Sequence, residues 1–527
     1  MIQYALIFFT QRLAIVYNWP KVGYFGVIWP DLNLYLAKTG VFCIFVAKYN
    51  TIMVGRVLEK QLLQRAIDRQ QAQIVIVYGR RRVGKTFLVN EFFNNDFAFK
   101  HTALSPFDRK SPKNQLSQQL IEFNYSLKSY GLNNSSAPSS WGEAFHMLQD
   151  LLDSKADGSN QVIFIDELPW MDTPKSGFVS AFEHFCNDWC SARKHVKLII
   201  CGSATSWIYD EMLNNKGGLY GRVTSSIYVK PFTLKECEEL FREEGFYLDK
   251  YDIVQAYMAF GGIPYYLSQF REDLSVVQNI DYLLFNPESL LYEEFDRLFA
   301  SQFANPELLK AIIEKIGGKR GGLTRAEIIS SLNSSSGGNI SKAIHSLEKN
   351  KLITSYKPFG ERITKYRLSD QFCYFYLHHV KPNKGNSSFW QTHYNSPAMY
   401  NWLGLAFEEV VFNHIEQVKL SLGISGVLST ESAWSVDKAD CEHGMQIDLL
   451  IDRADRVIDV CEIKFCNDEY VVNSSYSRVI MNRMEKTSQL FKGKKSVQSV
   501  LITTYGLKRN EYSSRFQKVI TLEDLFR

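Results

Sequence analysis

A short glycine-bounded stretch, GRRRVGKTF, has the residue types and spacing of a phosphate-binding loop. Glycines permit a tight bend whose backbone N–H groups face phosphate oxygens, and a helix starting near Lys85 points its positive dipole end the same way. Lys85 would reach the β and γ phosphates of a nucleotide, and Thr86 would offer its hydroxyl to Mg²⁺. The predicted nucleotide-binding residues here are Gly79, Arg80, Arg81, Arg82, Val83, Gly84, Lys85, Thr86 and Phe87.

Two carboxylates follow a second apolar run, VIFIDE. Asp166 would hold Mg²⁺ through the metal's waters, and Glu167 would polarise the attacking water. Ser203 and Thr205 follow a third run and could sense the γ-phosphate, or could be ordinary hydroxyls at the end of a strand. Arg222 is a candidate finger arginine, although arginines are common on protein surfaces.

The three apolar runs predict a fold class that brings these residues together. QIVIVY passes directly into the glycine-bounded loop, FLVNEFF restores helical spacing, and QVIFIDELPW and KLIICGSAT are separated by a helical stretch at 178–191. Short apolar runs of this kind are buried in parallel sheets, and strands alternating with helices indicate an open α/β sheet.

In this order, YGRRRVGKTFLV, FIDELPWM, CGSATSWI, LYGRVTSSIYVKPFT and GGIPYYL resemble the prokaryotic (archaeal-type) ATPase family within the AAA+ and STAND class of P-loop NTPases. The resemblance covers residues 54–299 and implies an ATP- and Mg²⁺-dependent ATPase with a helical lid. In that class a Gly-x-Pro turn of the lid lies beside the base, which points to Gly262 and Pro264. A simple helix break would give the same residues.

A second group of chemically suggestive residues interrupts the hairpin QIDLLIDRADRVIDVCEIKF. Glu462 and Lys464 are two apart and share one face of a strand, and Asp448 on the partner strand can approach them. Burying these charges on an aliphatic hairpin is costly unless they are paired or bound to a cation, and grouped hard oxygens suit Mg²⁺. Glu408, on the preceding helix, is a further candidate.

This set resembles the PD-(D/E)XK nuclease superfamily over residues 402–527. The resemblance implies that Asp448 and Glu462 ligate a metal, that Lys464 orients or activates the water, and that Glu408 supports the site. Ile447 stands where a proline is common in the pattern. An exposed hairpin with alternating charges, or a nuclease-like fold with a degraded site, are the alternatives.

Between Pro306 and Leu368 the pattern is helix, helix, helix, hairpin, which resembles a winged helix-turn-helix. From Lys310 to Arg367 twelve Lys or Arg stand against four Glu, a local net charge of +8. Such a charge is the footprint of a DNA-backbone binder. The predicted recognition helix, within 339–353, would expose Ser341, Lys342, His345 and Lys349. Winged helices in this class also act as rigid domains that close on the ATPase, so this alternative stays open.

The length, composition and net charge limit the class of protein. The chain has 527 residues, 45% hydrophobic and 22% charged, with a formal net charge of +4. It is therefore a multidomain globular protein whose nucleic-acid contacts must come from local clusters. The nine cysteines show no paired spacing, so neither a disulfide framework nor zinc is indicated and a cytoplasmic location fits.

The aromatic and apolar segment 1–53 is interrupted by charges before any run reaches the ~18 apolar residues of a membrane span. It is interpreted as an extension from a mis-called start with Met53 the natural one, as an added packing segment, or as a membrane-associating segment.

The sequence thus predicts an α/β protein: a P-loop NTPase parallel sheet with a helical lid, then a winged helix-turn-helix, then an α/β restriction-endonuclease-like domain. The expected boundaries are an extension at 1–53, the ATPase domain at 54–232, the lid at 233–300, the winged helix at 301–370, a connector at 371–400 and the nuclease-like domain at 401–527. The expected ligands are ATP or ADP, Mg²⁺ and DNA, with no membrane partner and with homo-oligomerisation left open. The alternative is a nucleotide-gated, non-catalytic DNA-binding or regulatory switch.

Overall fold

The computed structural model describes residues 53–527, apart from 106–114, 134, 215–218, 220, 301, 304, 320, 333–336, 359–360 and 437–444. The three interpretations of the N-terminal segment therefore lie outside the described residues, Met53 excepted. No helix among the described residues is both long enough and apolar enough to cross a membrane.

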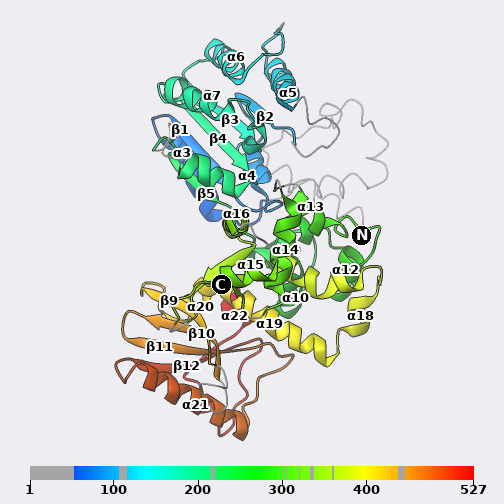
Figure 1. Cartoon of the computed structure of the whole chain (residues 1–527), viewed down its shortest axis with the longest axis vertical. Coiled ribbons are helices and arrows are strands. Elements are labelled where there is room, and N and C mark those ends of the chain that lie inside the picture. The colour runs from blue at the N-terminus through cyan, green and yellow to red at the C-terminus, as the bar shows by residue number, and fades with distance from the viewer. Residues whose placement is uncertain are drawn as a thin grey trace, which may run out of the picture. The chain divides into compact units, whose positions relative to one another are not determined.

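A five-stranded parallel sheet carries the glycine-bounded loop (Figure 1). Its strands lie in the order β2-β3-β4-β1-β5, and every pairing is parallel. The bounds are β1 (Gln73–Tyr78), β2 (Phe99–Thr102), β3 (Gln161–Asp166), β4 (Val196–Gly202) and β5 (Ser225–Tyr228). The predicted parallel α/β sheet is confirmed, and its apolar runs are buried on both faces as such a sheet requires.

Helices cover both faces of this sheet. Alternate residues of β1 face opposite cores, Val75 and Val77 toward one and Ile74 and Ile76 toward the other. The first face packs on α3 (Val57–Asp68) and α4 (Lys85–Phe92). The second packs on α5 (Gln115–Ser129), α6 (Trp141–Ser154), α7 (Phe178–His184) and the π-helix η3 (Phe185–Cys190). Short helical segments follow β3 and β4: η2 (Leu168–Met171), α8 (Thr205–Trp207) and η4 (Ile208–Leu213).

The next part of the chain is helical, as its sequence pattern predicts. It comprises α9 (Leu234–Glu243), α10 (Lys250–Phe260), α11 (Pro264–Leu267), α12 (Val276–Leu284) and α13 (Glu294–Ala300). The segments α17 (Gln371–Phe375), η5 (Tyr376–Val380), η6 (Lys381–Asn383) and α18 (Phe389–His393) come later in the chain. Of these, α17 packs against α10 and α18 against α12. Apart from η6, one apolar core joins these helices to a face of the parallel sheet.

The middle region, residues 306–368, has the order helix, strand, helix, helix, hairpin. Its elements are α14 (Pro306–Gly317), β6 (Leu323–Thr324), α15 (Arg325–Ser331), α16 (Gly337–Lys349), β7 (Ile353–Tyr356) and β8 (Lys365–Leu368). The three strands form a small antiparallel sheet in the order β6-β8-β7.

The C-terminal region, residues 397–527, contains a mixed sheet in the order β13-β12-β11-β10-β9. Its elements are α19 (Pro397–Asn413), α20 (Ile415–Leu422), β9 (Ser429–Val436), β10 (Met445–Arg453), β11 (Val457–Lys464), α21 (Ser474–Leu490), β12 (Ser496–Thr503), η7 (Ser513–Arg515), β13 (Lys518–Ile520) and α22 (Leu522–Leu525). The sequence pattern predicts one opening helix. The structure breaks it at His414, whose Nε2 accepts a hydrogen bond from the Leu234 N–H at 2.9 Å.

Candidate functional site

The loop after β1 has the backbone geometry of a phosphate cradle. Gly79 has φ 149°, and a Cβ at that position would lie 2.4 Å from the Val229 carbonyl oxygen. Gly84 has φ 89° and immediately precedes α4. Because L-residues with a side chain rarely adopt these conformations, glycine is required at both ends of the bend. The loop lies at the carboxyl edge of a parallel sheet, where ligands of such sheets bind.

Lys85 is buried at the centre of this loop. Its Nζ donates to the carbonyl oxygens of Gly79 at 3.1 Å and Arg80 at 3.0 Å. Burial lowers the pKa of this ammonium, although Glu167 and Asp166 oppose the effect. Arg56 stabilises the loop, because its guanidinium donates to the Val83 carbonyl at 2.8 Å. Lys85 is thus a buried cation hydrogen-bonded to two carbonyl oxygens, which a phosphate could replace.

The predicted magnesium and water-activating residues meet at the ends of β3 and β4. The Thr86 hydroxyl lies 3.0 Å from Asp166 Oδ2. Burial, and then the neighbouring Glu167, raise the pKa of Asp166 to about 6. Ser203 donates to Glu167 Oε2 from its N–H at 2.8 Å and from its hydroxyl at 2.9 Å. This buried, proton-attracting carboxylate beside a hydroxyl is a donor set that fits Mg²⁺.

Two of the three loop arginines point away from the phosphate position. Arg80 forms an ion pair with Asp370 at 2.7 Å, and Arg82 forms one with Glu294 at 2.9 Å. Any contribution of these two residues to nucleotide binding would come from their backbones. Arg81 and Phe87 are at least partly exposed, whereas Val83 is fully buried.

The GGIP turn is followed by an aromatic residue that contacts the glycine-bounded loop. Gly262 has φ 64°, and its carbonyl accepts from the Phe232 N–H at 2.7 Å. Pro264 begins α11, and the following Tyr265 ring lies 4.2 Å from the Arg82 guanidinium. The structure thus places this turn near the glycine-bounded loop.

Arg222 lies elsewhere. It precedes β5, and the adjacent Thr224 N–H bonds the Ile74 carbonyl near the start of β1. The glycine-bounded loop follows the other end of β1, so Arg222 is at the opposite edge of the sheet. Its side chain is exposed. Arg222 therefore lies away from the glycine-bounded loop. Thr205 is buried at the start of α8.

The second predicted site forms on β10 and β11 of the C-terminal region. Asp448 lies where the β9–β10 register shifts between Ile447 and Leu450, and such irregularities re-aim a side chain. Its Oδ2 accepts from the Ile463 N–H at 3.1 Å and lies 3.9 Å from Lys464 Nζ. Lys464 also forms an ion pair with Glu462. Asp448 and Glu462 are 7% and 6% exposed. The structure therefore brings these three residues together.

The charged groups in this site shift one another's pKa values. Burial, and then Glu462, raise the pKa of Asp448. Burial opposes the charge on Lys464, but Glu462 and Asp448 outweigh it and raise the pKa of this ammonium. Glu462 also contacts the Tyr476 hydroxyl and the Arg483 guanidinium, both on α21. A metal at Glu462 would have to compete with these partners.

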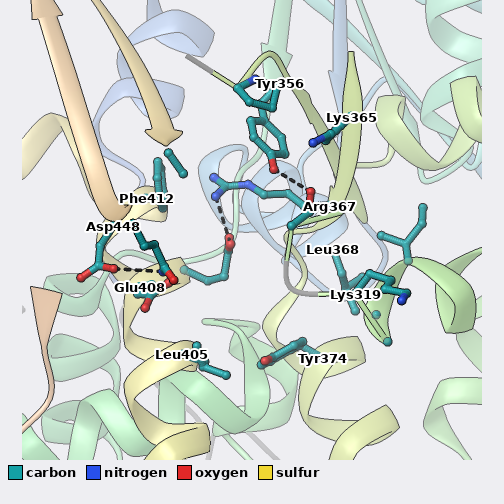
Figure 2. Close-up of a pocket in the computed structure, with 18 of the residues that line it drawn as sticks. Lys319, Tyr356, Lys365, Arg367, Leu368, Tyr374, Leu405, Glu408, Phe412 and Asp448 are labelled. Atoms are coloured by element: carbon teal, nitrogen blue, oxygen red, sulfur yellow. Dashed lines mark hydrogen bonds and ion pairs between the residues drawn. The ribbon is translucent and has the colours of Figure 1, made fainter. Parts of the chain in front are cut away.

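Glu408 projects from α19 and lines a pocket together with Asp448 (Figure 2). Among the described residues, no group of three or more His, Cys, Asp or Glu side chains is arranged to hold a metal ion. Two carboxylates are enough for Mg²⁺ when substrate phosphates complete its coordination, so Asp448 and Glu462 remain compatible with that ion.

The predicted recognition helix, α16, contacts the segment that follows β4. His345 Nε2 lies 3.3 Å from Asp210, and Ser346 bonds Ser206 at 3.2 Å. Lys349 Nζ lies 3.2 Å from the centre of the Tyr209 ring. His345 is exposed as expected, whereas Lys349 is only partly exposed. Lys342 remains exposed, while the Ser341 hydroxyl accepts from Arg325.

Sequence and structure comparisons bear on the first of these sites. Residues 53–270 match a family profile described as an ATPase domain predominantly from Archaea. This part of the chain is therefore similar to archaeal-type ATPase domains. The predicted family resemblance is confirmed for this part, whereas the winged-helix and nuclease-like assignments remain predictions.

Individual relatives come from archaea. An uncharacterized protein of Methanocaldococcus jannaschii is 26% identical over 336 residues, 63% of this chain and 70% of that protein. An uncharacterized ATP-binding protein of the same organism is 44% identical over 48 residues, 9% of this chain and 81% of that protein. A Walker-type ATPase structure from Pyrococcus abyssi is 19% identical, covering 62% of this chain and 96% of that one, with a TM-score of 0.41.

Several supporting residues escaped the sequence analysis. Asp370 forms an ion pair with Arg80, and Glu294 forms one with Arg82. Arg56 donates to the Val83 carbonyl, and the Tyr476 hydroxyl contacts Glu462. The first three lie 27 to 290 residues from their partners in the sequence, and Tyr476 lies on a different element from Glu462. No local spacing therefore links these residues. One signal in the sequence pointed to such partners. The glycine-bounded loop carries four basic residues and no acidic one, and buried cations need carboxylates to compensate their charge.

Proposed function

We propose that this chain is a Mg²⁺-dependent ATPase that binds ATP between its parallel sheet and the following helices and hydrolyses it. The observation that supports this most is the convergence of Lys85, Asp166 and Glu167 at one edge of the sheet. Lys85 would exchange its two carbonyl contacts for phosphate oxygens. Thr86 and Asp166 would hold Mg²⁺, which neutralises charge on the phosphates.

In this proposal Glu167 orients the attacking water and accepts its proton. The two hydrogen bonds from Ser203 fix the Glu167 carboxylate in the nucleotide-free state. When a γ-phosphate arrives, the Ser203 hydroxyl would bond it in place of Glu167, which would free Glu167 to meet the water. The serine would thereby connect phosphate recognition to catalysis.

The test is ATP binding and turnover by the full chain. We expect Lys85→Ala to abolish binding of ATP in calorimetry, because the main phosphate cation is lost. Lys128→Ala, an exposed lysine on α5, is the matched control and should bind normally. Normal ATP binding by Lys85→Ala would overturn the proposal.

We further propose that the nucleotide state acts on DNA through the middle and C-terminal regions. Three observations support a winged helix that contacts DNA: the order of elements in 306–368, the local charge of +8 and the exposed Lys342. In the C-terminal region, Asp448 and Glu462 would hold Mg²⁺, Lys464 would orient the water, and Glu408 would support the site. A metal there would supply a nucleophile and neutralise the scissile phosphate.

Plasmid nicking tests this second part. Mg²⁺-dependent nicking should disappear in Asp448→Asn, Glu462→Gln and Lys464→Ala, and should persist in Lys508→Ala, an exposed lysine of the same region. Nicking that survives all three substitutions would contradict a nuclease site at this position.

A specific observation favours a second candidate, a nucleotide-gated switch that does not cleave. Glu462 already contacts Lys464, Tyr476 and Arg483, so its charge is compensated without a metal. A chain that binds DNA in an ATP-dependent way, but cleaves none in Mg²⁺ or Mn²⁺, would establish this candidate instead.

A further inference from the structure

A pocket of about 370 Å³ lies between the middle and C-terminal regions (Figure 2). The end of α14 and the β7–β8 hairpin form one wall, and α19 and β10 form the other. It borders Asp448, one of the two carboxylates proposed to hold a metal. The pocket therefore extends the candidate cleavage site toward the middle region.

The two walls differ in charge. Lys319, Lys365 and Arg367 line the wall from the middle region, whereas Glu408 and Asp448 line the opposite one. Lys365 is only loosely paired, with Glu361 at 3.5 Å, and Lys319 is exposed. A ligand that carries phosphate toward the lysines and a metal-bound group toward Asp448 would match both walls.

An ion pair joins the two walls of the pocket. Arg367 and Glu409 form an ion pair at 3.2 Å and are 16% and 18% exposed. Arg367 Nε and Glu409 Oε2 are buried without a hydrogen bond. Burial raises the pKa of Glu409, although Arg367 opposes the shift. Both buried atoms are closed off from the pocket, so the ion pair joins its two walls and does not itself contact a ligand.

Aromatic side chains complete the pocket. Tyr356 is held by a hydrogen bond from its hydroxyl to the Gly321 carbonyl at 2.7 Å. Tyr374, His378 and Phe412 also line the space. Bases of single-stranded nucleic acids stack on rings of this kind. Pockets of about 300–1,000 Å³ hold single small ligands, so this one admits a nucleotide and excludes a duplex.

We propose that the pocket holds one unpaired nucleotide of a DNA strand. Lys319 and Lys365 bind the phosphates of that strand, and the base lies against the aromatic lining of the pocket. The adjoining phosphodiester then lies near Asp448. The inference rests on the proposed action on DNA and deepens it, because it makes strand ends, tails and junctions, rather than continuous duplex, the substrate class.

Fluorescence anisotropy of labelled oligonucleotides in EDTA, with the full chain, tests the inference without cleavage. The probes are a blunt duplex and the same duplex with a five-nucleotide tail, whose terminal base is 2-aminopurine. The pocket variant is Lys319→Ala/Lys365→Ala, and the control with equal charge loss is Lys315→Ala/Lys508→Ala, two exposed lysines outside the pocket. Free dAMP is a competitor that distinguishes a strand end from a loose nucleotide.

We expect the tailed duplex to bind about tenfold more tightly than the blunt one, the order of one stacked base. The 2-aminopurine fluorescence should change on binding. The pocket variant should lose both effects, and the control should keep them. Three outcomes would overturn the inference and leave the proposed DNA action standing. They are equal binding of tailed and blunt DNA, a preference for tailed DNA that the pocket variant retains, and binding of dAMP in the pocket without an effect on DNA binding. Absence of binding to any DNA would overturn both.

Discussion

The Arg80 guanidinium lies 2.7 Å from the Asp370 carboxylate, and their side chains are only 3% and 6% exposed. Arg80 belongs to the loop that would cradle phosphate, whereas Asp370 caps α17 by accepting from the Cys373 N–H at 2.8 Å. The loop is therefore tied to an element 290 residues away in sequence. Burial disfavours the charge on Arg80, but Asp370 outweighs it and raises its pKa.

Removing one member of this ion pair should destabilise the protein strongly. Asp370→Ala leaves the Arg80 charge buried and uncompensated, which costs about 3–5 kcal/mol in comparable sites. Urea unfolding would measure the loss. Asp273→Ala, which breaks an exposed pair with Arg271, should not move the midpoint, and Arg80→Met/Asp370→Leu should recover part of the stability. An Asp370→Ala protein as stable as the parent would show that the pair contributes little.

Glu167 and Ser203 should affect turnover more than binding. Glu167→Gln removes the proposed base, so we expect kcat to fall by about 10²–10⁴-fold while ATP affinity changes little. Ser203→Ala keeps the backbone hydrogen bond to Glu167 and should have a smaller effect. Steady-state ATPase assays and calorimetry measure both quantities. Ser129→Ala, on the exposed side of α5, is the control. Full activity in Glu167→Gln would assign the base elsewhere.

The pKa of Asp166 predicts a pH dependence of stability. Its folded value, about 6, exceeds the unfolded value near 4, so the folded state holds the proton more tightly between these pH values. The free energy of unfolding should fall as pH rises from about 4 to 6, by at most about 3 kcal/mol, and Asp166 should add no further slope above pH 6. Asp166→Asn should lack this component in urea titrations.

Mg²⁺ should act in the opposite sense, because it binds the ionised carboxylate. Its stabilising effect, in the presence of a non-hydrolysable ATP analogue, should increase as pH rises through about 6. Thermal melts at several pH values would measure it. If Asp166→Asn shows the same pH profile and the same Mg²⁺ effect as the parent, Asp166 is not the titrating ligand.

The contact between α16 and the segment after β4 should restrain DNA binding. Tyr209 carries the Lys349 ammonium over its ring, and Asp210 lies beside His345. Tyr209→Ala should free Lys349 and raise the affinity for duplex DNA severalfold, whereas Lys342→Ala should lower it. Anisotropy at two salt concentrations would measure both. A Tyr209→Ala protein with unchanged affinity would mean that α16 does not bind DNA or is not restrained.

Tyr476 should compete with a metal at Glu462. Tyr476→Phe removes the hydroxyl that contacts this carboxylate while retaining the ring. We expect a lower Mg²⁺ concentration for half-maximal nicking in this variant, and no nicking in Glu462→Gln. A Tyr476→Phe protein that needs more Mg²⁺ would indicate that the hydroxyl positions Glu462 for the metal rather than competing with it.

Local patterns in the sequence determined the parallel sheet, the glycine-bounded loop and the positions of Asp166, Asp448 and Glu462. This follows because periodicity of apolar residues and glycine-dependent turns are properties of short segments. The predicted hairpin, 446–452 and 457–465, agrees with β10 and β11 to within a residue at each end. Asp166 therefore lies at the end of a strand that the pattern marked, and Asp448 and Glu462 lie within two others.

The tertiary structure alone decided which distant groups compensate these residues and which surfaces stay open. Arg80 and Arg82 turn from the phosphate position to Asp370 and Glu294, and Arg222 lies at the wrong edge of the sheet. Lys349 rests on Tyr209 instead of facing solvent. A buried charge must find its partner wherever packing brings one within reach, and no periodicity in the chain records that choice.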